Sequence, residues 1–144
     1  FWIVGRDPVR RVRALGSQPG VRVTGRVDDV EPFYGKAKVA VAPFRYGGGT
    51  KLKVLEAMAL GVPVVATRIG CQGIEAVPGK HLFLAETSKC FADRVVALLR
   101  HERLRKETAI EARQLVEQRY AWAHVVGQIE RKMVDLLRSR QLSS

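Results

Sequence analysis

The chain has 144 residues, of which 47% are hydrophobic, and its 25 lysines and arginines outnumber its 14 acidic residues to give a formal net charge of +11. The length suits one domain with a hydrophobic core, and no apolar run approaches the roughly 20 residues of a membrane-spanning helix. Cys71 and Cys90 lie outside any C-x-x-C pair and the three histidines are dispersed, so we expect reduced thiols, a cytoplasmic location and no metal site.

Continuously apolar or β-branched segments predict strands of a parallel sheet that is buried on both faces, because such strands do not alternate. The segments are 1–4, 21–24, 39–42, 62–66 and 81–84. Helical patterns separate them at 8–15, 30–36 and 50–60, and Gly61 closes the last of these helices. The alternation of strand and helix predicts an α/β fold, a right-handed doubly wound parallel sheet.

A helical period begins after Glu86, and it predicts a helical part over 87–138 within a single domain of residues 1–144. The first helix starts at a cap formed by Thr87 or Ser88, the second covers 102–119 and the third covers 122–138, with a frayed tail beyond.

The third helix carries one broad apolar stripe. Its members are Val125, Val126, Ile129, Met133, Leu136 and Leu137. A chain of this length leaves few residues against which the stripe could pack. We therefore expect this helix either to be mobile or to pack against a second copy, which would give a homodimer.

The most informative segment runs from Pro43 through three consecutive glycines, Gly47 to Gly49, to Gly61. Glycines lack Cβ and tolerate positive φ, so a ligand can reach the backbone, and the N–H groups at the start of the following helix favour an anion. Glu56 lies seven positions after Gly49, on the same helix face and roughly 10 Å further along the axis. The spacing predicts a nucleoside diphosphate site, with phosphates at the glycines and the ribose diol at Glu56.

Other phosphate-binding motifs fit this segment poorly. A P-loop needs Gly-Lys-Ser/Thr, whereas residues 49–51 are Gly-Thr-Lys, and a dinucleotide fingerprint needs Gly or Ala where Leu52 stands. The alternative without a ligand is a surface turn capped by Thr50, with Glu56 paired to Lys53.

The positive charge invites a nucleic-acid interpretation. However, the basic residues are spread along the chain, and no aromatic platform or recognition helix accompanies them. We therefore expect no nucleic acid partner, and we expect part of the charge to face a membrane surface or an anionic substrate.

The string from Gly49 to Thr67 resembles the donor-binding signature of GT-B fold glycosyltransferases, in the large retaining family that includes sucrose and glycogen synthases. Flanking blocks are similar to the same family, especially to exopolysaccharide-associated bacterial enzymes, so that the resemblance covers nearly the whole chain. These blocks are 3–5, 23–27, 33–34, 39–43, 70–75, 91–92 and 120–122. The resemblance implies the Rossmann-like C-terminal half of a GT-B enzyme, with C-terminal helices.

The family's motifs imply a role for the residues that match them. Glu56 corresponds to the second Glu of an E-x7-E motif, which holds the ribose hydroxyls of the nucleotide. The backbone amides of Gly49, Thr50 and Lys51 correspond to those that take the donor diphosphate.

Two further parts of the site follow from the resemblance. The chain at Arg26 and Val27 corresponds to the segment that lies against the nucleobase. The family's first Glu falls on Gly48, so the carboxylate that often holds the donor sugar is missing. We expect backbone groups of Gly48 and its neighbours, or the side chain of Arg45, to hold the sugar instead.

The implied function is that of the donor-binding domain of an enzyme that transfers a sugar from a UDP- or GDP-linked donor to a glycan or lipid-linked acceptor, with retention. We expect no cofactor, an acceptor domain and a first strand outside this chain, no transfer by the isolated chain, and a place at the cytoplasmic face of the inner membrane. The resemblance assigns no catalytic residue here. A nucleotide-sugar epimerase of the same fold and a non-catalytic nucleotide-binding module remain as alternatives.

Overall fold

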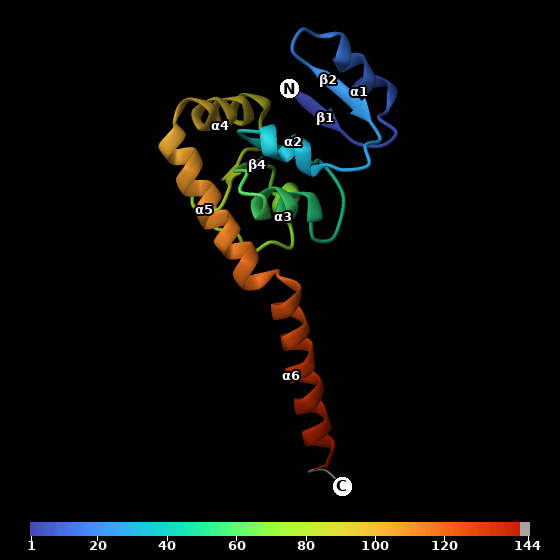
Figure 1. The fold of residues 1–144 in the computed structure, drawn as a ribbon, viewed down its shortest axis with the longest axis vertical. Helices are drawn as coiled ribbons and strands as arrows, with labels where there is room; N and C mark the ends of the chain where they lie inside the picture. The colour runs from blue at the N-terminus through green and yellow to red at the C-terminus, as the bar shows by residue number, and fades with distance from the viewer. Residues whose placement is uncertain (142–144) are drawn as a thin grey trace. The chain divides into compact units, whose positions relative to one another are not determined.

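The structure is a computed structural model that describes the backbone of residues 1–141 and the side chains of residues 1–135. It comprises two compact units, residues 1–37 and the chain from Lys38 onward. The first unit holds β1 (Trp2–Val4), α1 (Arg10–Ala14), a 3-10 turn (Leu15–Ser17), β2 (Arg22–Gly25) and α2 (Glu31–Lys36) (Figure 1).

In the first unit, β1 and β2 pair in parallel, with Trp2 opposite Arg22 and Ile3 opposite Val23. The Trp2 ring meets Phe33 of α2 edge to face, with 5.5 Å between the ring centroids. The Arg22 guanidinium lies 5.0 Å from the centroid of the Trp2 ring. The aromatic contact attaches α2 to β1, and the cation–π contact adds a side-chain link between β1 and β2.

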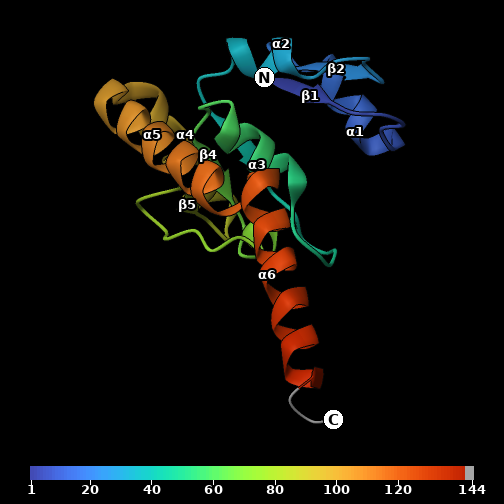
Figure 2. The ribbon, with the colours of Figure 1, turned by 60° about the horizontal axis from the view of Figure 1, so that its bottom comes forward.

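The second unit contains three strands and four α-helices among the described residues. They are β3 (Ala40–Ala42), α3 (Leu52–Ala59), β4 (Val64–Ala66), β5 (Phe83–Leu84), α4 (Ser88–Arg100), α5 (Glu102–Arg119) and α6 (Trp122–Gln141), and a 3-10 turn (Ile69–Cys71) follows β4. The strands form a parallel sheet in the order β3-β4-β5, and α5 packs against α3 and α4 (Figures 1 and 2).

The core of the second unit lies around β4. All three residues of β4 are buried, and fully buried side chains from α3 and α4, including Val54, Met58 and Leu98, complete this interior. Burying one such side chain contributes about 1.5–3 kcal/mol. The core therefore holds α3 and β4 as rigid elements, and the glycine segment must turn between α3 and β3, the strand that pairs with β4.

The predicted parallel α/β fold is confirmed, but the described strands form two ladders, β1-β2 and β3-β4-β5, instead of one. The prediction that the strands are buried on both faces holds only for β4. In the other strands, every residue except the buried Ala42 of β3 is exposed or only partly buried. The physical reason is that β4 is the central strand of its ladder and contacts both α3 and α4, and a continuously apolar run does not reveal how much of a strand's faces the helices cover.

Helix boundaries follow the predicted signals closely. Gly61 closes α3 with a φ of +70°, and the Thr87 hydroxyl accepts a hydrogen bond from the N–H of Cys90 at 3.2 Å to cap α4. The helix predicted over 50–60 begins two residues later than expected, at Leu52, where Lys51 takes the N-cap position without a side-chain bond.

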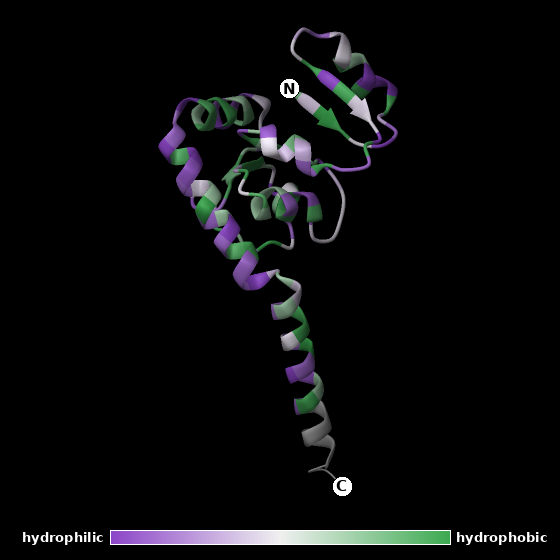
Figure 3. Ribbon diagram, in the orientation of Figure 1, coloured by the Kyte–Doolittle hydropathy of each residue, from purple (hydrophilic) through white to green (hydrophobic). Residues whose placement is uncertain are grey.

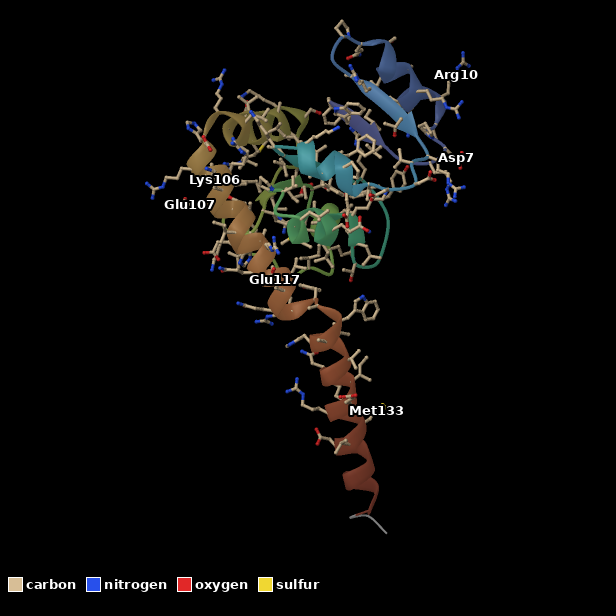
Figure 4. All side chains as sticks on the ribbon, viewed as in Figure 1. Asp7, Arg10, Lys106, Glu107, Glu117 and Met133 are labelled. Carbon is tan, nitrogen blue, oxygen red and sulfur yellow. The ribbon has the colours of Figure 1, made fainter. Side chains whose placement is uncertain are left out.

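The last two helices differ in surface character (Figure 3). α5 is mostly hydrophilic and carries i,i+4 salt bridges such as Arg103–Glu107 and Arg113–Glu117, whereas α6 exposes Trp122, Ile129 and Met133. Met133 projects from the surface of α6 in Figure 4. The side chains of Leu136 and Leu137 fall outside the described side chains. The sequence predicts a frayed tail from residue 139, but α6 continues through Gln141, because the backbone there keeps its helical hydrogen bonds; residues 142–144 lie outside the described part of the chain. Within residues 1–141, no helix has the length and apolar character needed to cross a membrane.

Candidate functional site

The glycine segment is an exposed loop between β3 and the N-terminus of α3. Gly47 and Gly49 adopt φ values of +116° and +71°, which L-residues rarely adopt, whereas Gly48 has an ordinary φ. A Cβ added at Gly48 or Gly49 would meet nothing within 4 Å. The backbone at these two glycines is therefore open to a ligand.

The predicted phosphate-binding amides are available. Within the described part of the chain, the N–H groups of Gly49, Thr50 and Lys51 donate no hydrogen bond. They directly precede Leu52, the first residue of α3, so they lie at the positive end of the helix dipole. The Thr50 side chain does not cap the helix, so the interpretation as a Thr50-capped turn is wrong.

The side chain of Lys51 binds the loop itself. Its ammonium donates to the carbonyl oxygens of Gly47 at 2.9 Å and Gly48 at 2.8 Å, and it lies 5.9 Å from the centroid of the Phe44 ring. These bonds hold the carbonyls of the loop together and keep a positive charge beside the open amides. Lys51 therefore stabilises the loop conformation through its side chain and contributes an open N–H through its backbone.

Glu56 occupies an exposed position on α3. Lys53 lies three positions before it on the same helix. Arg45, in the loop, is also exposed.

Arg26 and Val27 belong to the first unit, and they follow Gly25, whose φ is +72°. Arg26 is exposed and Val27 is half-buried. The Gly25 carbonyl accepts a hydrogen bond from the N–H of Gly5 at 3.2 Å, which ties together the ends of β1 and β2. Arg26 also borders a hollow of about 700 Å³ between β2 and α1, together with Arg13 and Thr24. The other predicted site residues all lie in the second unit.

Sequence reasoning missed the turn that follows β4 as part of the candidate site. The Thr67 hydroxyl donates to the Phe44 carbonyl at 2.6 Å and accepts from the N–H of Gly70 at 3.0 Å, and Gly73 lies against Thr50. The blocks that carry the family resemblance included Gly70 and Gly73. Two glycines shortly after a buried strand are a signal of close backbone approach that could have identified this turn.

A second long-range link joins two blocks that the sequence presents separately. The Tyr120 hydroxyl accepts a hydrogen bond from the N–H of Glu75 at 2.7 Å, and Arg119 forms a 2.7 Å salt bridge with the Glu75 carboxylate. The end of α5 is thereby attached to the segment that follows the turn after β4.

His81 and Cys71 lie outside the glycine segment, and each forms a hydrogen bond with the backbone. Nδ1 of His81 accepts from the N–H of Val77 at 2.9 Å, and burial lowers the pKa of this imidazole. Burial likewise raises the pKa of the Cys71 thiol, which donates to the Arg68 carbonyl. Among the described residues, no group of three or more His, Cys, Asp and Glu side chains could hold a metal ion.

Together these features define a doubly wound type of α/β protein whose candidate site lies where parallel strands end. The family model described as "Glycosyl transferases group 1" matches residues 1–101, and the chain belongs to this family. The predicted relation to GT-B fold glycosyltransferases is thus confirmed.

Similar proteins include curated and structurally solved glycosyltransferases. The chain is 36% identical over 135 residues to the phosphatidyl-myo-inositol mannosyltransferase of Mycobacterium leprae, covering 90% of this chain and 36% of that protein. The C-terminal domain of the group 1 glycosyl transferase LpcC from Francisella tularensis has a TM-score of 0.65 at 25% identity, covering 76% of this chain and 58% of that one.

A mutant of TarM from S. aureus, solved with UDP, Fondaparinux and alpha-GlcNAc-glycerol, has a TM-score of 0.76 at 22% identity, covering 94% of this chain and 28% of that chain. The chain described here thus spans about a third of the curated mannosyltransferase. Nothing in these matches supports the alternative of a nucleotide-sugar epimerase.

Proposed function

We propose that this chain is the nucleotide-sugar-binding domain, over residues 1–144, of an enzyme that transfers a sugar from a UDP- or GDP-linked donor to a glycan or lipid-linked acceptor with retention. The observation that carries the proposal is the row of open N–H groups at Gly49, Thr50 and Lys51, directly before α3. Membership of the glycosyltransferase family supports it, and so does the presence of UDP in the solved TarM mutant.

Each predicted site residue has a part in this function. The three amides and the dipole of α3 bind the donor diphosphate and stabilise the charge that develops on it as it leaves, without a metal or other cofactor. The exposed carboxylate of Glu56 accepts hydrogen bonds from the ribose diol. Arg26 and Val27 lie against the nucleobase.

Binding of the donor sugar differs from that in the family pattern because residue 48 is glycine. Backbone groups of Gly48, together with the exposed Arg45 side chain, take the place of the missing carboxylate. The nucleotide therefore supplies most of the affinity.

The rest of the enzyme supplies the acceptor site. Transfer requires two substrates held together, and positioning accounts for much of the rate gain. This chain alone therefore binds donor without transferring sugar. The enzyme works in the cytoplasm, peripherally at the inner membrane, where basic residues face anionic lipids. When this chain is isolated, α6 is either mobile or pairs its apolar stripe with a second copy.

A thermal-shift screen of the 144-residue chain against UDP, GDP, ADP and their sugar nucleotides tests the proposal. A ligand that binds only the native state must raise the melting temperature. We expect the nucleotides of one of the three bases to raise the melting temperature, and random duplex DNA at the same ionic strength to leave it unchanged. No shift with any nucleotide, together with salt-sensitive micromolar binding to duplex, would favour a nucleic-acid module.

A further inference from the structure

We propose that Thr67 is a positioning residue for the donor diphosphate, because its hydroxyl holds the glycine loop against the turn that follows β4. This inference rests on the proposed function. It concerns a residue that contacts no predicted donor group itself and acts through the backbone of the loop.

Thr67 directly follows β4, and 9% of its surface is exposed. Its N–H donates to the Ala42 carbonyl at 3.2 Å, at the end of β3. Its hydroxyl donates to the Phe44 carbonyl at 2.6 Å and accepts from the N–H of Gly70 at 3.0 Å. One hydroxyl thus uses both its donor and an acceptor lone pair to connect the start of the glycine loop with the turn after β4.

The same turn touches the other end of the loop through Gly73. A Cβ built on Gly73 would lie 2.6 Å from Oγ1 and 3.0 Å from Cα of Thr50, and the φ of Gly73 is +77°. A Cβ on Gly70 would lie 2.5 Å from the Ala42 carbonyl oxygen. Both glycines are therefore needed for the turn to lie this close to its neighbours.

The loop is thus fixed at both ends by one turn. Thr67 fixes it at Phe44, and Gly73 fixes Thr50, the middle residue of the three open amides. Between these points the loop is exposed, apart from the bonds of Lys51 to its own carbonyls. A change in the turn must therefore move the amides, and a shift of a fraction of an ångström weakens hydrogen bonds that depend on donor direction.

This arrangement predicts that a change at Thr67 weakens binding of a diphosphate more than binding of a monophosphate, whereas a general loss of stability would not distinguish the two ligands. Valine has the shape of threonine but neither donates nor accepts, whereas serine keeps the hydroxyl. We expect Thr67→Val to weaken binding of the preferred nucleoside diphosphate about tenfold, the loss of one net hydrogen bond of about 1.4 kcal/mol. Binding of the corresponding monophosphate should change less than threefold, and Thr67→Ser should restore the diphosphate affinity to within threefold.

Calorimetric titration of UDP, UMP, GDP and GMP into the wild-type chain and the variants measures these ratios. Thr87→Val is the matched control, because it also removes a hydroxyl bonded to a backbone N–H, that of Cys90 in α4. It should lower the melting temperature and leave the ratio of diphosphate to monophosphate affinity unchanged. Gly73→Ala tests the same turn independently if Thr67→Val does not fold, and it should lower that ratio.

Three results would overturn the inference: a wild-type ratio in a folded Thr67→Val, a failure of Thr67→Ser to restore binding, or an unchanged ratio in Gly73→Ala. Failure of the proposed function would look different, since the unaltered chain would then bind none of the four nucleotides. In that case the positioning role falls with it.

Discussion

Replacement of Glu56 by alanine tests whether its carboxylate binds a ligand or is only solvated. Glu56 is exposed on α3, and alanine has a helix propensity at least as high as that of glutamate. The free energy of unfolding should therefore change by no more than about 0.5 kcal/mol. Loss of hydrogen bonds from the charged carboxylate to a ribose diol should cost about 1–3 kcal/mol of binding, a roughly 5- to 150-fold weaker nucleoside diphosphate.

Isothermal titration calorimetry with UDP and GDP gives the affinity, and urea unfolding of the same preparations gives the stability. Glu56→Gln keeps an acceptor oxygen but loses the charge, so its affinity should lie between those of the wild type and Glu56→Ala. Glu107→Ala, which removes an exposed carboxylate from α5, is the control and should bind as the wild type does. If Glu56→Ala keeps full affinity while folded, the ribose assignment is refuted.

Four other predictions concern the loop, the sugar, pH and α6. Gly49→Val should abolish measurable diphosphate binding, because the φ of +71° strains a β-branched residue and its side chain fills the space through which a ligand reaches the backbone. An unchanged diphosphate affinity in the same titration would contradict the phosphate assignment. Gly48→Glu should fold normally, since Gly48 has an ordinary φ and space for a side chain. It should increase the preference for sugar nucleotide over bare diphosphate up to about tenfold. In the unaltered chain the two ligands should bind about equally, and a hundredfold preference for the sugar nucleotide there would show that another group already holds the sugar. Because burial lowers the pKa of His81 in the folded state, the unfolded chain binds more protons below about pH 6.5, the ordinary imidazole pKa. The free energy of unfolding should therefore fall as the pH drops below this value. Urea unfolding between pH 7.5 and 5 should show that this free energy depends less steeply on pH in His81→Gln. In the isolated chain, α6 should be either mobile or paired with a second copy. If light scattering shows a dimer, Met133→Glu should make it monomeric. A monomeric wild type with slow hydrogen exchange throughout α6 would refute both outcomes.

Much of the secondary structure was predictable because its signals are local. The hydrophobic period and its flanking residues predicted α5 over 102–119 and a cap at Thr87 or Ser88, of which Thr87 is the cap, and Gly61 marked the end of α3. These signals depend on residues within a few positions of each other, so they survive whatever packs around them. The same local chemistry located the open amides before α3.

The sequence by itself thus determined the elements, the α/β class and the segment where a ligand can approach the backbone. Only the tertiary structure decided which strands pair, that β4 alone is buried throughout, and that Lys51 bonds to the loop instead of extending from it. It also brought Thr67 to Phe44, 23 positions apart, and Glu75 to Tyr120, 45 positions apart. Contacts at such separations depend on how rigid elements pack against a shared core, and the spacing of residue types along one chain carries no direct record of that packing.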